Sequence, residues 1–131
     1  MITLFNILAV ALGGGLGASL RFIVNHCVIG TFPDLKFPLA TFLINIIGCA
    51  CIGLVVGFST KHEVSETVRV FIVTGILGGF TTFSAFGLEA VTLVRGGHFT
   101  EALAYIVGSV TLGCGAVFVS LVATESKLIT P

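Results

Sequence analysis

The stretch "GGFTTFSAF", from Gly78 to Phe86, lies within a run of residues that carries no charge between Val70 and Leu88. A helix needs roughly 20 apolar residues to cross the hydrocarbon core of a bilayer, so this run has the length of a membrane span. Two glycines and the hydroxyl side chains after them interrupt its apolar pattern. We therefore predict that the helix is broken near Gly78-Gly79. Broken helices at membrane depth occur where they line a site or are buried in protein.

The composition of the whole chain is that of an integral membrane protein. Of its 131 residues 56% are hydrophobic and 9% are charged, with a mean hydropathy of +1.17, whereas about 25% of residues are charged in a soluble domain. No Lys or Arg precedes the first apolar run, so the run lacks the basic start of a cleaved signal peptide and counts as a span. We predict an all-α fold with one domain (residues 1–131) and four transmembrane helices, at about residues 3–24, 38–59, 69–94 and 100–123.

The basic residues near the span ends divide evenly between the two sides of the membrane. An excess of lysine and arginine on one side normally fixes the orientation of a membrane protein. Here one side receives Lys61, Arg69 and Lys127, and the other receives Arg21, Lys36 and Arg95. The balance predicts that the chain inserts in both orientations, with other determinants of topology as the alternative explanation.

Glycines recur at a spacing of four within the predicted spans: Gly13 and Gly17, Gly53 and Gly57, and Gly75 and Gly79. Residues four apart share a helix face, and glycine there lets another helix backbone approach closely. Residues 13–18 also match the G-x-G-x-x-A dinucleotide fingerprint. That fingerprint needs alternating strands and helices, which a chain of membrane-length runs does not provide. We therefore interpret the glycine pairs as helix contacts.

The cysteines do not show the spacing of a metal site or a disulfide framework. Cys49 and Cys51 are two residues apart on a predicted helix, so their side chains point about 200° away from each other. A shared metal ion requires ligands that converge. We interpret all four cysteines as small apolar residues: Cys27, Cys49, Cys51 and Cys114.

The few polar side chains within the predicted spans carry hydrogen-bond donors rather than acids. Asn45 lies in the second span, and Arg21 closes the first. Tyr105 and Ser109 lie one turn apart in the fourth span and can face the same groove. A proton-coupled exporter or a cation pathway would place Asp or Glu at mid-depth. Donors without carboxylates are suited to an anion.

Phe83 and Phe86 follow the predicted break, and their spacing of three places both rings on one helix face. An aromatic ring has a positive edge, so two rings turned edge-on attract a small desolvated anion. Ordinary packing of two phenylalanines is the simpler alternative on spacing alone.

The opening stretch resembles the signature of the Fluc (CrcB) fluoride channels, which is usually G-G-L-T-T-F-S-T-F. The resemblance covers the whole chain, because "GGGLGASLRF" contains Arg21, "FLINIIGC" contains Asn45, and Glu89 follows the two phenylalanines. It implies an antiparallel, dual-topology homodimer in the inner membrane of a bacterium. It further implies two pores that export fluoride passively, a structural sodium ion at the dimer centre, surrounding membrane lipid, no enzymatic activity and no nucleic-acid partner.

The resemblance also implies a role for individual residues. The sodium ion would be held by the backbone carbonyls of Gly78 and Thr81. Arg21 and Glu89 would lie in the vestibule, the wide mouth of the pore. Two positions depart from the family pattern: Ala85 and Gly113 stand where a hydroxyl side chain is usual, so the resemblance does not extend to the outer part of the row of polar side chains along the pore. The implied fluoride pore is lined by Asn45, Phe83, Ser84, Phe86, Tyr105 and Ser109.

Two other classes of protein remain as alternatives. A small dual-topology multidrug-type exporter would share the length and charge balance, but it needs a carboxylate in the first span, and Asp34 is the earliest acid. A non-transporting assembly subunit would share the glycine contacts but would have no need for donors beside aromatic rings. Fluoride flux distinguishes the channel from both.

Overall fold

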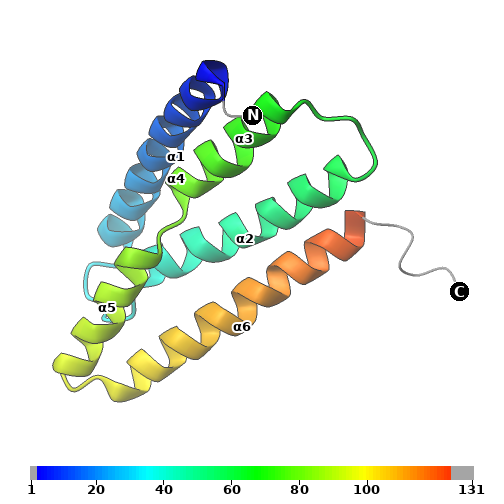
Figure 1. Ribbon diagram of the computed structural model, residues 1–131. Helices are drawn as coiled ribbons and strands as arrows, with labels where there is room; N and C mark the ends of the chain where they lie inside the picture. Colours follow the sequence, from blue (N-terminus) through cyan, green and yellow to red (C-terminus); the bar gives the residue numbers. More distant parts are fainter. Residues whose placement is uncertain (1–2, 125–131) are drawn as a thin grey trace, which may run out of the picture.

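The computed structural model of the chain describes residues 3–124, which form helices joined by short connections (Figure 1). The described residues contain no β-strand. Four helical segments are long and apolar enough to cross a membrane: Leu4–Thr31, Leu39–Ser59, Glu66–Arg95 and Phe99–Thr124. The predicted all-α fold with four spans is therefore confirmed.

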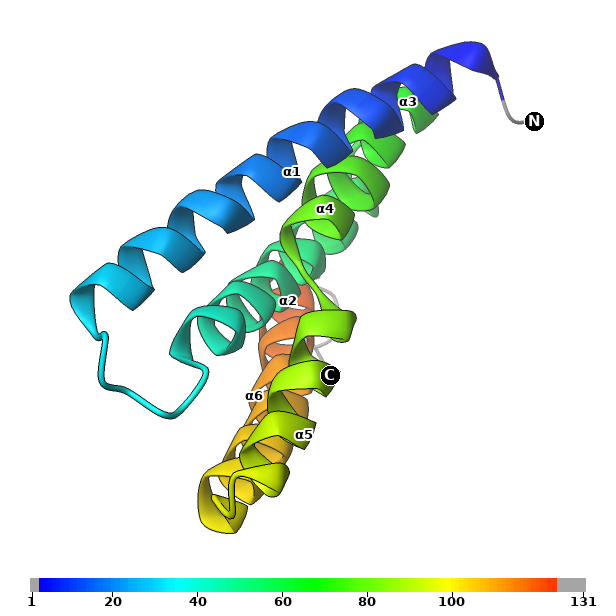
Figure 2. The same cartoon turned by 90° about the vertical axis from the view of Figure 1, so that its left-hand side faces the viewer.

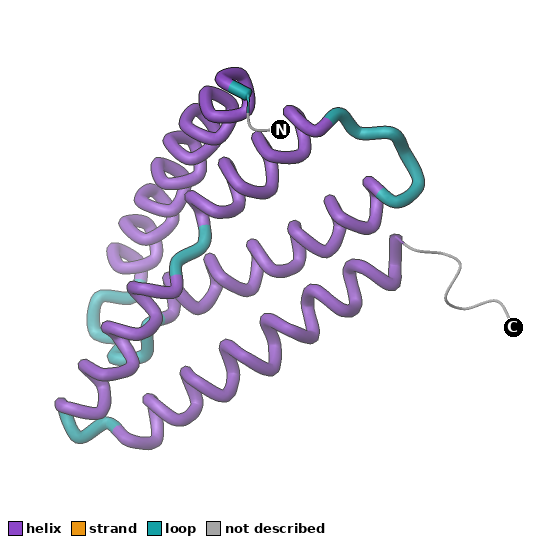
Figure 3. Tube along the Cα trace, viewed as in Figure 1, coloured by secondary structure: helices purple, strands orange, loops and turns teal. Residues whose placement is uncertain are grey.

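The third span differs from the others because it is interrupted. The other spans are single helices, namely α1 (Leu4–Thr31), α2 (Leu39–Ser59) and α6 (Phe99–Thr124). The third consists of α3 (Glu66–Val70), the π-helix η1 (Phe71–Leu77), α4 (Gly78–Phe80) and α5 (Phe83–Arg95). A short loop separates α4 from α5 inside this span (Figure 3).

The break falls at Thr81 and Thr82, just after the glycine pair at which it was expected. Gly78 keeps helical backbone angles (φ −65°, ψ −35°). Thr81 (φ −78°, ψ 159°) and Thr82 (φ −153°, ψ 117°) are extended. The side-chain oxygen of Thr82 accepts a hydrogen bond from the N–H of Ala85 at 3.3 Å and so caps the start of α5. The hydroxyl residues, rather than the glycines, therefore separate the two helices.

Helix α1 is longer than the sequence pattern indicated. It continues past the expected end near residue 24 to Thr31, where Pro33 prevents further helix. The residues between Arg21 and Thr31 are mostly apolar and include no proline. Arg21 therefore lies inside α1 and does not close it, which corrects the expected place of this residue.

The helices pack mainly as two pairs (Figure 2). α2 and α6 run side by side, and α1 packs along η1 and α4. α5 turns away from the direction of α4 and packs near the start of α6 (Figure 2). The break thus allows one span to contact α1 before the interruption and α6 after it.

Glycines form the contact between α1 and the first half of the third span. A Cβ atom added to Gly17 would collide with the carbonyl oxygen of Ile76. One added to Gly75 would lie 2.9 Å from the Cα of Gly13, and one added to Gly79 would collide with a carbonyl oxygen of α1. The predicted helix contacts of these two glycine pairs are therefore confirmed.

Glycines four residues apart also form the contact between α2 and α6. A Cβ atom on Gly53 would collide with the hydroxyl of Ser120, and one on Gly57 with the hydroxyl of Thr124. Each hydroxyl donates to a backbone carbonyl of its own helix, at 2.7 Å for Ser120 and 2.8 Å for Thr124. The close contact therefore introduces no unpaired hydroxyl group.

Basic residues near the span ends lie at both ends of the bundle. Lys61 follows α2 and Arg69 lies in α3 at one end, and Lys36 precedes α2 and Arg95 ends α5 at the other. Lys127 lies outside the described residues. Basic residues of the described part of the chain therefore lie near the span ends on each side.

We expect Gly17→Ala to destabilise the protein by about 1–3 kcal/mol, the usual cost of overpacking a tight contact. The added methyl group would meet backbone atoms of Ile76 and Phe80, which cannot rotate away as a side chain can. Denaturant unfolding in detergent micelles measures the change. Gly15→Ala is the matched control, because nothing lies within 4 Å of its Cβ position. Equal stabilities of the two variants would contradict the close contact of α1.

Candidate functional site

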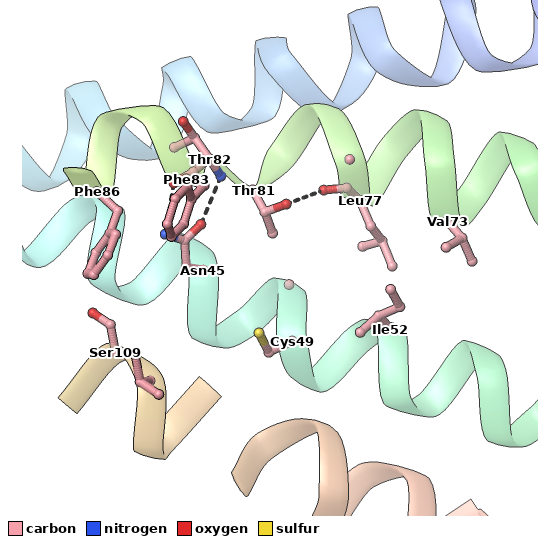
Figure 4. Close-up of a pocket in the computed structure, with 13 residues that line it drawn as sticks. Asn45, Cys49, Ile52, Val73, Leu77, Thr81, Thr82, Phe83, Phe86 and Ser109 are labelled. Carbon is pink, nitrogen blue, oxygen red and sulfur yellow. Dashed lines mark hydrogen bonds between the residues drawn. The ribbon is translucent and has the colours of Figure 1, made fainter. Parts of the chain in front are cut away.

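A cavity of about 350 Å³ lies beside the break, between α2, both halves of the third span and α6 (Figure 4). We call it the break cavity. None of the described residues that line it is charged, and polar groups and aromatic rings meet there. Six residues that the family resemblance implicates line it: Asn45, Gly78, Thr81, Phe83, Phe86 and Ser109.

The side chain of Asn45 pairs with the backbone at the break. Its Nδ2 donates to the carbonyl of Thr82 at 3.1 Å, and its Oδ1 accepts from the N–H of Thr82 at 2.8 Å (Figure 4). Thr82 has left the helix, so both of its backbone groups would otherwise lack helical partners. One amide hydrogen of Asn45 remains after these bonds. Asn45 therefore both stabilises the break and keeps a donor for the cavity.

The carbonyl groups before the break have unusual partners. In a continuous helix the N–H of Thr82 would donate to the carbonyl of Gly78, but it donates to Asn45 instead. The carbonyl of Gly79 accepts a hydrogen bond from Nε of Arg21 at 3.0 Å. Gly78 therefore presents a carbonyl oxygen that has lost its helical donor.

Phe83 and Phe86 have different surroundings although they share a face of α5. Their ring centroids lie 5.5 Å apart with an interplanar angle of 34°. Phe86 packs on the ring of Tyr105 with centroids 5.1 Å apart. Phe83 is 84% exposed. One ring therefore belongs to the packing of α5 on α6, and the other projects from this chain.

The polar residues expected along the pore face different directions in the single chain. Ser109 lines the break cavity, and its hydroxyl oxygen is buried without a hydrogen-bond partner among the described residues. Tyr105 is 0% exposed and donates its hydroxyl to Glu89 at 2.7 Å. Ser84 is exposed, with its oxygen 3.3 Å from that of Thr82. Of the three, the structure brings Ser109 alone into the cavity.

Glu89 lies within the third span, and two hydroxyl groups donate to its carboxylate. Thr41 donates to one oxygen at 2.8 Å and Tyr105 to the other at 2.7 Å. The expectation that polar side chains within the spans are donors rather than acids is therefore wrong for Glu89, which lies just outside the uncharged run but inside both the predicted third span (69–94) and the observed one (Glu66–Arg95). The carboxylate is tolerated in this apolar setting because both oxygens are hydrogen-bonded.

Thr41 is the site residue that sequence reasoning missed. It is 5% exposed and lies four residues before Asn45 on α2. Residues four apart share a helix face. The spacing of four from Asn45 was therefore the sequence signal that could have indicated Thr41. It was not sufficient, because threonine is common in apolar helices and the partner of Thr41, Glu89, is distant in the sequence.

Backbone oxygens are the candidate ligands for a metal cation in this chain. The four cysteines are free thiols. The described residues contain no group of three His, Cys, Asp or Glu side chains placed to hold a metal ion. A hard cation takes oxygen ligands, and the carbonyl of Gly78, which has lost its helical donor, is an oxygen of this kind.

These features define a class of membrane transport protein: a small four-span bundle whose third span breaks beside an uncharged polar cavity. The chain belongs to the CrcB family, because residues 8–121 match the family described as "CrcB-like protein, Camphor Resistance (CrcB)". The resemblance inferred from "GGFTTFSAF" is thereby confirmed.

Similar proteins from bacteria carry the name "Fluoride-specific ion channel FluC". The protein from Methylobacillus flagellatus is 46% identical over 111 residues, which cover 84% of this chain and 87% of the relative. That from Azobacteroides pseudotrichonymphae is 40% identical over 121 residues (92% and 96%). That from Chloroflexus aurantiacus is 45% identical over 117 residues (88% and 92%).

We expect Tyr105→Phe to destabilise the protein by about 1–3 kcal/mol, because it removes one of the donors to the carboxylate of Glu89. Denaturant unfolding of the single and double variants with Thr41→Val measures the effect. The two losses should be non-additive, since both hydroxyls bind one carboxylate. A Tyr105→Phe variant as stable as the wild type would show that this hydrogen bond contributes nothing.

Proposed function

We propose that this protein is a fluoride-selective channel of the bacterial inner membrane through which cytoplasmic fluoride leaves passively. The observation that carries the proposal is the break cavity, which combines donors and aromatic rings and has no charge among its described lining residues. The name of the relatives, fluoride-specific ion channel, supports the same substrate.

Selectivity for fluoride requires donors that replace its water. A small anion is strongly hydrated, so a path that strips its water must offer hydrogen-bond donors in return. Asn45 has one amide hydrogen left, and the hydroxyl of Ser109 has no partner among the described residues. Glu89, the nearby acid, is already engaged by two hydroxyls. The cavity therefore offers donors and limits anionic repulsion.

Passive flow is sufficient for export. Hydrogen fluoride crosses membranes as a neutral molecule and dissociates near neutral pH, which leaves the anion inside. A negative-inside potential drives a monovalent anion outward by roughly 2.3 kcal/mol per 100 mV. Export through this channel therefore needs neither a coupled ion nor chemical catalysis.

The working unit in this proposal is an antiparallel homodimer surrounded by lipid. Thr81 and Thr82 are half-buried, and Phe83 and Ser84 are exposed in the single chain. Irregular backbone and hydroxyl groups are costly against lipid. A second copy that covers the break removes this cost and places Phe83 of one subunit near Phe86 of the other in each of two pores.

A sodium ion at the dimer centre is the proposed structural cofactor, held by the carbonyls of Gly78 and Thr81 from both subunits. Gly78 fits because the N–H of Thr82 has been diverted to Asn45. Thr81 fits because the N–H of Ala85, its donor in a continuous helix, bonds to the hydroxyl of Thr82. Unwound backbone carbonyls of this kind coordinate sodium in other membrane transport proteins.

Fluoride efflux from liposomes tests the function. The purified protein is reconstituted with potassium fluoride inside, and a fluoride electrode records release after valinomycin is added. We expect rapid release of fluoride and no comparable release of chloride. Release no faster than from protein-free liposomes would reject the channel.

We expect Asn45→Asp to abolish most fluoride efflux while the protein still forms dimers. An aspartate oxygen can still accept from the N–H of Thr82, which preserves the break and the dimer. The substitution nevertheless removes the donor to the Thr82 carbonyl and places an anion beside the cavity. Liposome efflux and size-exclusion chromatography measure the two properties. Unchanged efflux would remove Asn45 from the pore.

Isoleucine at Phe83 or Phe86 separates pore chemistry from packing. The change keeps an apolar side chain but removes the positive ring edge, so pore chemistry predicts dimers that lose most efflux. Packing alone predicts near-normal efflux and a stability change of about 1 kcal/mol. Phe→Met keeps a polarizable side chain and should retain more efflux than Phe→Ile.

The matched control for these variants is Phe71→Ile, which lies in η1 of the same span and outside the break cavity. Its efflux should equal that of the wild type. Normal conduction by both Phe83→Ile and Phe86→Ile would show that the ring edges take no part in the path.

A further inference from the structure

Arg21 is a cation within a membrane span and has no acidic partner in the described structure. It lies inside α1, and no carboxylate of residues 3–124 comes within ion-pair distance of it. Its hydrogen bond is to the carbonyl of Gly79 at 3.0 Å. Ionisable residues within spans are rare and usually functional. The partner of Arg21 indicates what this function is.

The contact replaces a hydrogen bond that the break removes. In a continuous helix the carbonyl of Gly79 would accept from the N–H of Phe83, but Phe83 begins α5 on the other side of the break. The guanidinium of Arg21 supplies the donor instead. A cation at the carbonyl end of a helix is also favoured by the helix dipole. Arg21 therefore caps α4.

The position of Arg21 is fixed by the close contact beneath it. Gly17 lies one turn before Arg21 on α1, and a Cβ atom added to it would collide with backbone atoms of Ile76 and Phe80. The base of the arginine therefore cannot shift relative to α4 without separating two packed backbones. A side chain whose base is fixed in this way donates to one defined acceptor, here the carbonyl of Gly79.

The neighbouring carbonyls of Gly78 and Gly79 therefore differ in their hydrogen bonding. Arg21 binds Gly79, while the diversion of the Thr82 N–H to Asn45 leaves Gly78 available. We propose that Arg21 is a positioning residue for the proposed sodium site, which caps α4 through Gly79 and thereby directs the carbonyl of Gly78 toward the ion. This inference rests on the proposed sodium-bound channel.

Two effects of Arg21 on sodium have opposite signs, which makes the inference testable. Capping organises the carbonyl of Gly78 and raises the affinity for sodium. The positive charge of the guanidinium repels sodium and lowers the affinity of the site for sodium. The guanidinium bonds directly to the backbone next to Gly78, at 3.0 Å from the carbonyl oxygen of Gly79, so the organising effect is the larger one in this proposal.

The experiment measures how the thermal stability of the purified dimer depends on sodium concentration, in a buffer whose ionic strength is held with N-methylglucamine. We expect Arg21→Met, which has no donor, to raise the half-saturating sodium concentration by about tenfold or more. Arg21→Lys and Arg21→Gln both keep a donor, so each should recover most of the wild-type value. Arg95→Met, at the exposed end of α5, is the control and should leave the value unchanged.

Amide hydrogen exchange gives a second readout that does not depend on sodium binding or on fluoride flux. Exchange across residues 78–85 should be faster in Arg21→Met than in the wild type, and close to wild type in Arg21→Lys. Exchange in α6 should be the same in all of them, which separates a local effect from general unfolding.

Several outcomes would overturn the inference. Sodium affinity of Arg21→Met equal to or higher than that of the wild type would show that capping does not organise the site. If Arg21→Met does not fold, a tenfold loss of affinity in Arg21→Gln would equally reject a role through the hydrogen bond. A wild-type dimer without any sodium response would remove the sodium site itself, and absent wild-type efflux would remove the channel, both independently of the Arg21 variants.

Discussion

The two hydrogen bonds between Asn45 and the backbone of Thr82 are the interaction on which the rest of the structure depends. Without them an extended residue in an apolar span would leave two backbone groups unpaired, which lipid cannot satisfy. With them the third span can end one helix at Phe80 and begin another at Phe83. The break in turn opens the cavity and frees the carbonyl of Gly78.

The break is supported on both sides by different physical means. Before it, glycines allow α1 and α4 to touch backbone to backbone, which places Arg21 on the Gly79 carbonyl. After it, Glu89 links α5 to α2 through Thr41 and to α6 through Tyr105. Tight apolar contact therefore fixes one half of the span, and a hydrogen-bonded carboxylate fixes the other.

Part of the candidate site could be located from the sequence, because its chemistry is local. Phe83 and Phe86 follow the break in one short stretch, and Asn45 is the asparagine of its span. The partners that give other residues their roles come from distant parts of the chain. Spacing along one helix could therefore not predict the hydrogen bond from Tyr105 to Glu89, because this bond depends on how α5 and α6 pack.

The sequence by itself determined the membrane environment, the four spans, the glycine faces and the presence of a break, because run length, composition and helical spacing act along one chain segment. The tertiary structure alone decided where the break falls and what stabilises it. Helix termini shift by a few residues toward whichever neighbours satisfy their backbone groups. Here Asn45 on α2 selects Thr82, and the packing of α1 brings Arg21 to Gly79, so the exact geometry of the site follows from helix packing.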